Sequence, residues 1–303
     1  ALGQAHAFVL RSPIAHAKIQ SIDTEKAGNF DGVLAILTGE DLVKRNLGGL
    51  KPAFAGQRSD GKPGFVCSQP LLAQERVRFI GEPVAFIIAE KLNQAKDAAE
   101  LIFVDYQPLK PLISVDEALE SGAPKIWEEN QDNEAYTFER GDASKVTAAF
   151  ADAEYIVRHR VCVNRVACNA METRGCIGTY DSYEDRYTLR ATVQSVHGIR
   201  QQIAGQIFKM PQTQLRVICD NMGGGFGIKG GCYPEYSLAL WGSEVVGRPI
   251  KWIADRSESL LSDEQARGGL VDAELALDKD LSLIHLSAPT RRYAIAYAVF
   301  CLK

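Results

Sequence analysis

Residues 220–229 read DNMGGGFGIK, and this stretch decides the fold. It follows an apolar run at 215–219 that is typical of a buried strand, and it precedes a helix-like segment at 236–246. A strand, a glycine-rich loop and a helix N-terminus together present backbone N–H groups to an anion. Because glycine has no Cβ atom, the backbone can also approach a ligand closely. The stretch therefore predicts a backbone-lined ligand site to which Lys229 adds one positive charge. The alternative is a tight turn without a ligand.

Length and composition limit what the chain can be. Its 303 residues are 46% hydrophobic and 24% charged, which is ordinary for a globular protein. The formal net charge of −4 offers no basic field for nucleic acid. No apolar run approaches the roughly 18 residues that cross a bilayer, so we expect neither a nucleic-acid partner nor a membrane span. The seven cysteines form no CxxC pair, which argues against a metal site and predicts reduced thiols in the cytoplasm.

Strand and helix patterns alternate along the chain, and they predict an α+β fold. The first unit, residues 1–110, combines apolar strand patterns with an alanine-rich helix at 91–100. Residues 111–140 are interpreted as a connecting segment because Gly, Pro and polar residues interrupt any periodicity. The second unit begins at 141, and a stripe of isoleucines predicts a helix over 197–208.

Residues 225–230 read GFGIKG and formally satisfy the dinucleotide-binding pattern GxGxxG after a strand. In a Rossmann fold this turn runs straight into its helix, whereas here several residues separate Gly227 from the helical segment. The phosphate-loop pattern GxxxxGK[ST] does not occur in the sequence. These features favour a site for a phosphate or another oxygen-rich ligand. A nucleotide-binding module or an NAD-dependent dehydrogenase that uses the loop is the alternative.

Two further segments carry candidate site residues. Gln194 stands where a strand ends and a helix begins, so its side-chain amide could bind an oxo or hydroxo ligand. The alternative is that Gln194 or Ser195 only caps the helix. Glu172 and Arg174 precede a strand, and their spacing on a strand would put both side chains on one face, where they could hold each other or a ligand. The alternative there is a solvated ion pair.

Residues 223–229, GGGFGIK, resemble the GGGFGxK signature of the molybdenum hydroxylase large subunits. This family includes xanthine dehydrogenases, aldehyde oxidoreductases and aerobic carbon monoxide dehydrogenases. The resemblance runs from residue 1 to about 280, and it implies an α/β-hammerhead domain at 1–110, a connecting segment at 111–140 and a truncated first molybdopterin-binding domain at 141–280. The other stretches that carry it are RSPIAHAKI at 11–19, IGEPVA at 80–85, METR at 171–174, residues 194–200 and RPIKW at 248–252.

The resemblance also implies a function and its cofactors. Large subunits of this family hold molybdenum on molybdopterin, usually as the cytosine dinucleotide form in bacteria. They oxidise or hydroxylate a small substrate, such as an aldehyde, an N-heteroaromatic compound or carbon monoxide, with oxygen from water. Electrons then pass to an FAD-binding medium subunit and a 2Fe-2S small subunit. The implied assembly is a dimer of such heterotrimers.

Positions can be carried over from the family motif one by one. Gln194 would hydrogen-bond an oxygen ligand of molybdenum. Backbone amides from Gly225 to Gly227 would face the cofactor, with Phe226 closest to the metal, and no side chain of this chain would bind the metal directly. This arrangement agrees with preorganised donors around an oxygen-rich ligand. The cofactor-binding residues implied are Gln194, Gly224, Gly225, Phe226 and Gly227, with Glu172 and Arg174 as supports of the pocket.

The C-terminal part of the sequence departs from the family. The family's catalytic glutamate would lie beyond residue 303, so we expect an N-terminal fragment that is inactive alone. Residues 281–303, LSLIHLSAPTRRYAIAYAVFCLK, resemble translated sequencing-adaptor sequence and are interpreted as a non-native tail. The alternative is a genuine pair of apolar strands, because residues 293–302 have adequate β-propensity.

Overall fold

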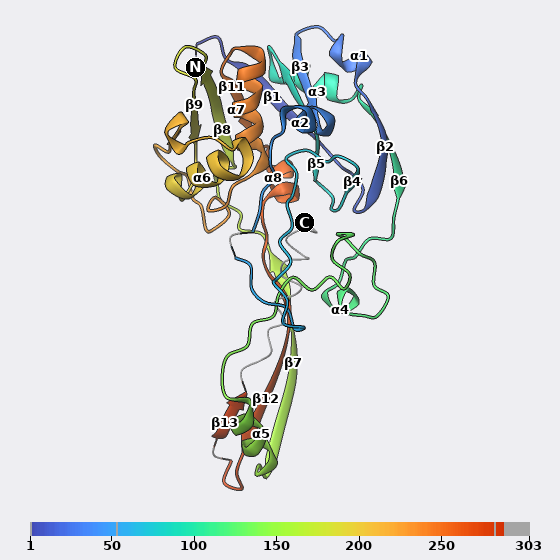
Figure 1. Ribbon diagram of the computed structural model, residues 1–303, viewed down its shortest axis with the longest axis vertical. Coiled ribbons are helices and arrows are strands. Elements are labelled where there is room, and N and C mark those ends of the chain that lie inside the picture. The colour runs from blue at the N-terminus through green and yellow to red at the C-terminus, as the bar shows by residue number, and fades with distance from the viewer. Residues whose placement is uncertain (1, 53, 282, 288–303) are drawn as a thin grey trace.

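A computed structural model describes residues 2–52, 54–281 and 283–287. The described residues form a body of sheets and helices, from which a long two-stranded ribbon extends (Figure 1). The ribbon consists of β7 (Tyr155–Val166) and β12 (Ala266–Leu277), which pair antiparallel along their whole length. Within the body, helices pack on a sheet whose strand pairs are mostly antiparallel, which agrees with the predicted α+β class.

The largest sheet contains seven strands in the order β10-β9-β8-β11-β1-β5-β3. Three of its strands come from residues 1–110 and four follow residue 141. The two groups meet where β1 pairs parallel with β11, with Ala5 opposite Ile250. The proposed domain boundaries therefore separate segments of sequence, whereas the sheet is continuous across them. Its strands are β1 (Ala5–Arg11), β3 (Val33–Thr38), β5 (Pro83–Ala89), β8 (Gly175–Asp181), β9 (Arg186–Ala191), β10 (Leu215–Ile218) and β11 (Ile250–Ile253).

Helices cover both faces of this sheet, as strand β5, between β1 and β3, shows. Its Phe86 and Ile88 lie in the core that includes residues of α7 (Pro234–Val246). The alternate residues Ala85 and Ile87 pack with α3 (Leu92–Ala99) on the opposite face. A strand buried on both sides needs a continuous apolar sequence, and PVAFIIA provides one.

Helix α7 follows the glycine loop and fixes the position of the loop's downstream end. It begins at Pro234, a residue favoured in the first turn, and its C-cap is Gly247 at φ 70°. It packs closely on β8, because a Cβ atom at Gly178 would lie 2.4 Å from the Ala239 carbonyl carbon. The helix predicted at 236–246 is thus confirmed, and it starts two residues earlier.

The helix predicted at 197–208 is regular only in its first half. Helix α6 (Val196–Gln202) continues as a π-helix, η1 (Ile203–Phe208). The Ile207 carbonyl accepts a hydrogen bond at 2.8 Å from Gly48 N, which belongs to the loop after α2. A hydrogen bond from a distant part of the chain therefore satisfies one carbonyl group of the last turn. The stripe of isoleucines did not indicate that this half of the helix would be π-helical.

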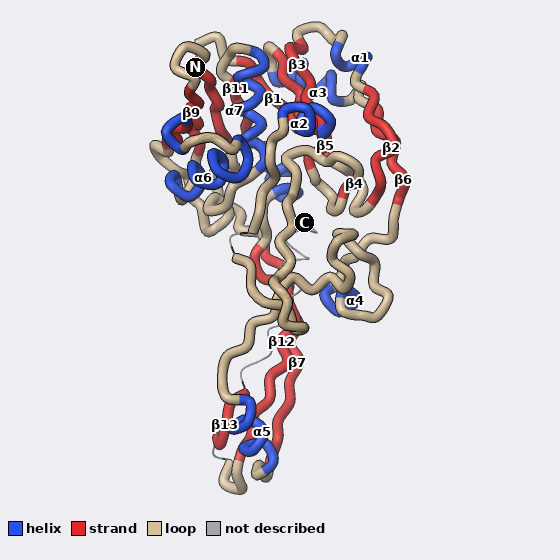
Figure 2. The backbone as a smooth tube through the Cα atoms, viewed as in Figure 1, coloured by secondary structure: helices blue, strands red, loops and turns tan. Residues whose placement is uncertain are grey.

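Most of the remaining elements lie in the body, whereas α5 and β13 lie at the far end of the ribbon (Figure 2). The described residues between α2 and β4 are loop with isolated bridges, and the connecting segment packs on them through Thr137 N, which donates to Gln57 O at 2.7 Å. Within the described ranges, no helix is long and apolar enough to cross a bilayer. The other elements are β2 (Ala17–Asp23), β4 (Arg76–Val77), β6 (Phe103–Pro108), α1 (Glu25–Gly28), α2 (Gly39–Arg45), α4 (Val115–Ala118), α5 (Ala143–Ala151), η2 (Gln212–Gln214), α8 (Arg256–Ser262) and β13 (Leu283–Ser287).

Only part of the proposed non-native tail, 281–303, falls within the described residues. Strand β13 pairs antiparallel with β12, with Leu286 opposite Leu275. The strands that the alternative interpretation needs at 293–302 lie outside the described residues.

Candidate functional site

The glycine loop connects β10 to α7 and contains a tight turn. Ile228 N donates to Gly225 O at 3.0 Å, and the two residues between them, Phe226 and Gly227, have φ angles of 49° and 98°. Positive φ at both central positions is the geometry of a type I′ turn. A phenylalanine rarely adopts this conformation, and the Phe226 side chain is 73% exposed. The turn therefore holds an aromatic side chain outside the core.

The carboxylate of Glu172 binds both ends of the glycine loop. Glu172 Oε2 accepts hydrogen bonds from Gly223 N at 2.8 Å and from Lys229 Nζ at 2.7 Å. Burial alone would raise the pKa of Glu172, but Lys229 and the Gly223 N–H outweigh it and hold this pKa below its usual value. Lys229 is fully buried. The positive charge that Lys229 was expected to add to the loop is therefore fixed in place, and it is paired with the Glu172 carboxylate.

Gln194 contacts the loop from the end of β9. Its backbone N donates to Lys229 O at 2.9 Å, and its side-chain Oε1 accepts from Gly227 N at 3.0 Å. Ser195, not Gln194, caps α6, since Ser195 Oγ accepts from Gly198 N. Gln194 is exposed, and its Nε2 donates to no protein group within the described ranges. The alternative that the residue only caps the helix is therefore correct for Ser195 and wrong for Gln194. The Nε2 group of Gln194 remains available to donate to a ligand.

The loop presents a short run of backbone donors. Among the residues that the structure describes, the N–H groups of Gly224, Gly225 and Phe226 donate to no protein acceptor. The Gly227 N–H, which was expected to face the ligand, donates to Gln194 instead. Three consecutive N–H groups beside a side-chain amide suit a ligand that offers several oxygen acceptors.

Arg174 lies behind this site and does not meet Glu172. Residues 172–174 are not part of a strand, because β8 begins at Gly175, so the expectation that the two side chains share a face is wrong. Arg174 is fully buried and donates to Glu235 Oε2 at 2.9 Å and to Asp263 Oδ1 at 2.5 Å. The solvated ion pair that was the alternative is excluded as well.

Sequence reasoning missed the acidic partners of Arg174. Glu235 stands in the first turn of a mostly apolar helix, where a carboxylate complements the helix dipole. This position in the first turn was the sign in the sequence from which a structural role of Glu235 could have been inferred. Asp263 follows the last residue of α8 and carried no comparable sign.

A hollow of about 270 Å³ lies beside the start of the loop. Glu172, Asp220 and Asn221 contribute to its lining, together with residues of β8, β9 and β11. It gives a ligand bound at the loop room to extend over the sheet. In the described part of the chain, no group of three or more His, Cys, Asp or Glu side chains is arranged to hold a metal ion.

Replacing Glu172 with glutamine tests the carboxylate's hold on the loop. We expect Glu172→Gln to reduce the free energy of unfolding by about 1–2 kcal/mol, because buried Lys229 loses its ionic partner while Glu172, 40% exposed, is partly screened by water. Urea unfolding at neutral pH measures the difference.

The pH dependence of that difference provides the control. The pKa of Glu172 is lower in the folded chain than in the unfolded one, so its contribution is complete above the unfolded value and is lost as pH falls through the folded value. The gap between wild type and Glu172→Gln should therefore shrink in acid below about pH 4. A gap that widens there would contradict the ion pair.

Two protein families match the chain. The a/b hammerhead domain of aldehyde oxidase and xanthine dehydrogenase matches residues 1–110, and the molybdopterin cofactor-binding domain matches residues 126–298. The second match spans more than half of the sequence and defines a molybdopterin-binding protein. Together with the first, it shows that the chain belongs to the molybdenum hydroxylase family. The GGGFGIK resemblance and the α+β fold class are thus confirmed.

Relatives of known function agree with this assignment. The carbon monoxide dehydrogenase large chain of Afipia carboxidovorans is 37% identical over 283 residues, which are 89% of this chain and 34% of that protein. The nicotine 6-hydroxylase large subunit of Paenarthrobacter nicotinovorans is 32% identical over 280 residues, 92% of this chain and 33% of that protein. The solved structure of reconstituted CO dehydrogenase from Oligotropha carboxidovorans gives a TM-score of 0.84 at 34% identity, covering 94% of this chain and 36% of that one. The chain thus spans about a third of the length of these relatives.

Proposed function

We propose that this chain forms one side of a molybdopterin site, and that the full-length large subunit oxidises or hydroxylates a small substrate with oxygen from water. The observation that carries the proposal is the run of three N–H groups, unpartnered in the described part of the chain, beside the Gln194 amide in a molybdopterin-binding domain. The family match favours this function over the dinucleotide-binding alternative.

The residues present fit the cofactor. Molybdopterin carries a phosphate, and its metal carries oxygen ligands, so it requires donors rather than carboxylates. The N–H groups of Gly224, Gly225 and Phe226 are such donors, and Lys229 neutralises the Glu172 carboxylate that anchors the loop. When bound, the group supplies two-electron redox chemistry. The protein supplies orientation, since Gln194 is itself held by Gly227 N.

The finer features of the assembly are part of the same proposal. Relatives are described as a carbon monoxide dehydrogenase, a nicotine 6-hydroxylase and a quinoline 2-oxidoreductase. These descriptions support a small substrate such as carbon monoxide or an N-heteroaromatic compound. We propose the cytosine dinucleotide form of the cofactor, a FAD-binding subunit and a 2Fe-2S subunit as partners, a dimer of heterotrimers, and a cytoplasmic location. Glu172 and Arg174 act as supports of the pocket.

Pterin content of the purified chain tests this function. The 303-residue chain, produced in a host that makes molybdopterin, is expected to retain the pterin, which is measured by fluorescence after oxidative release. Gln194→Ala should lower the retained pterin roughly tenfold, because a hydrogen bond to a charged or strongly polar ligand is worth about 1.5 kcal/mol or more.

Tyr183→Ala is the control for the pterin measurement. It changes a side chain that is 98% exposed at the β8–β9 turn, away from the loop, and should retain pterin like wild type. Wild-type chain that holds no more pterin than an unrelated protein, before and after incubation with released cofactor, would refute the proposal. Hydroxylase turnover by these 303 residues alone would contradict the inactivity expected of a chain that spans about a third of its relatives.

A further inference from the structure

A buried series of ion pairs joins β1 to the start of α7. Arg11, the last residue of β1, donates through Nη2 to Glu235 Oε1 at 2.6 Å, and Glu235 Oε2 accepts from Arg174 Nη1 at 2.9 Å. Arg174 Nε continues to Asp263 Oδ1 at 2.5 Å. The side chains of Arg11, Glu235 and Arg174 are 7%, 1% and 0% exposed, so these charges depend on one another and not on water.

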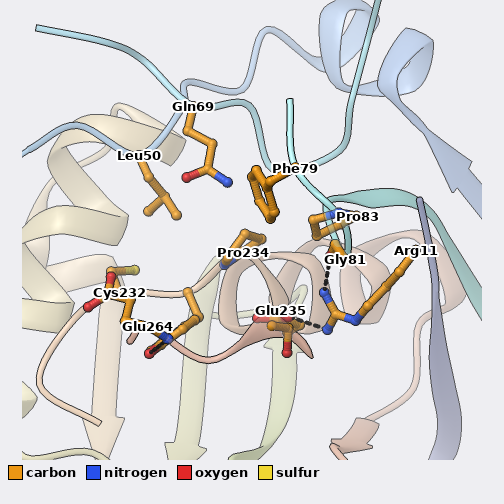
Figure 3. A pocket seen from close by; sticks show the side chains of 12 residues that line it. Arg11, Leu50, Gln69, Phe79, Gly81, Pro83, Cys232, Pro234, Glu235 and Glu264 are labelled. Carbon is orange, nitrogen blue, oxygen red and sulfur yellow. Dashed lines mark hydrogen bonds and ion pairs between the residues drawn. The ribbon is translucent and has the colours of Figure 1, made fainter. Parts of the chain in front are cut away.

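Arg11 links two parts of the chain, because it comes from the hammerhead segment whereas its carboxylate partners, Glu235 and Glu258, follow residue 141. One guanidinium holds three elements. Besides Glu235 on α7, it donates through Nη1 to Gly81 O at 3.0 Å (Figure 3). Through Nε and Nη2 it also donates to Glu258 Oε1 on α8 at 3.0 and 2.7 Å. The planar fork of arginine can satisfy such divergent acceptors, whereas a lysine ammonium is a single point charge.

A small cavity adjoins this junction. Its volume is about 50 Å³, and its lining includes Arg11, Glu235 and the three residues that precede Glu235 (Figure 3). Cys232 and Tyr233 beside the cavity are buried in the hydrophobic core, so the ion pairs add to the packing that fixes this segment.

Residues 232 and 233 connect the glycine loop to α7, and Glu235 is the second residue of that helix. Tyr233 lies directly under Arg174, with the guanidinium carbon 3.7 Å from the ring centre, and Glu235 follows two residues later. Upstream of them, Lys229 is anchored by Glu172. A shift of Glu235 would therefore act on the short segment 230–234, whose upstream end, Lys229, is held by Glu172.

We propose that Arg11 is a positioning residue for the glycine loop: through Glu235 it fixes the segment that follows the loop, so that the hammerhead segment helps to set the conformation in which the loop's N–H groups are presented. The expected effect on the order of the loop follows from these contacts and does not depend on the proposed function. The expected effect on cofactor retention rests on the proposed function.

Hydrogen exchange and pterin content of the full 303-residue chain test the proposal together. In Arg11→Met, amides of peptides spanning 221–236 should exchange about tenfold faster, beyond any change in global stability, and retained molybdopterin should fall roughly tenfold. Arg248→Met is the matched control. Arg248 also joins the two segments, through Glu90 at 2.6 and 2.9 Å, but this pair is open to solvent and lies at the opposite end of β1, so loop exchange should not change.

Arg11→Lys keeps the positive charge, and hydrogen exchange of the loop is measured in this variant if Arg11→Met does not fold. Because an ammonium cannot hold Glu235, Glu258 and Gly81 O in the same plane, loop exchange should be intermediate. Loop exchange like wild type in a folded Arg11 variant, or no faster than the average of the chain, would overturn the positioning role. Faster loop exchange in a chain that never retains pterin would leave the positioning role intact and refute the proposed function.

Discussion

Replacing Arg174 with methionine is expected to reduce the free energy of unfolding by about 3–5 kcal/mol, the typical cost of removing one partner of a buried ion pair. The variant leaves Asp263 without the guanidinium and leaves Glu235 with Arg11 alone. Burial raises the pKa of Glu235, but the charges of Arg174 and Arg11 outweigh it and bring this pKa to about 2. Without Arg174 the ionised carboxylate of Glu235 is therefore far less favourable, and urea unfolding at neutral pH should show the loss.

Acid titration distinguishes this ion pair from a packing defect. Because the folded-state pKa of Glu235 is lowered, its stabilisation is present above the unfolded value of about 4.3 and disappears as pH falls toward 2. The difference between wild type and Arg174→Met should narrow over that range, whereas a packing defect would not depend on pH. As a control, Arg160→Met removes an exposed pair with Asp272 on the β7–β12 ribbon and should change stability little. A difference independent of pH would assign the effect to packing.

The elements around the loop could be predicted from sequence because their signals are local. The apolar runs at 215–219 and 236–246 give β10 and α7 directly, and Gly247 marks the end of the helix. The glycines between them indicate a loop that approaches a ligand. The pattern at 197–208 also predicts a helix, but its π-helical half depends on a donor from Gly48.

Pairings between distant residues could not be predicted in this way. Lys229 and Glu172 are 57 positions apart, and Arg174 is separated from Asp263 by 89. Nothing near Lys229 in the sequence shows that its charge is neutralised. The continuous sheet across residues 110–141 is hidden for the same reason, since β1 and β11 meet only in the fold.

Segment 172–174 shows why the local expectation failed. Thr173 Oγ1 donates to Ala254 O at 2.7 Å, and Ala254 N donates to Arg174 O at 3.0 Å, so the backbone is tied to the end of β11 before β8 begins. The two charged side chains of this segment therefore lie in different surroundings. Glu172 reaches the glycine loop, while Arg174 enters the core behind it.

Gly225→Ala is expected to lower molybdopterin retention about tenfold, as Gln194→Ala does, because both changes remove the Gln194 amide from the loop. Position 225 does not require positive φ, so an alanine backbone fits, but its Cβ would lie 2.6 Å from Gln194 Cδ. Gln194 must then move, which breaks its bond to Gly227 N and carries its amide away from the N–H groups at 224–226. Pterin fluorescence after oxidative release measures the loss.

Two companion variants separate the steric effect from the chemistry of the amide. Gly269→Ala introduces a methyl group on the ribbon, where no described atom lies within 4 Å of the new Cβ, and should retain pterin like wild type. In Gly225→Ala combined with Gln194→Ala the clash disappears, so thermal stability should recover while pterin retention remains low. Retention restored by the double variant would show that loop shape, and not the Gln194 amide, holds the cofactor. Unchanged retention in Gly225→Ala would remove this loop from the site.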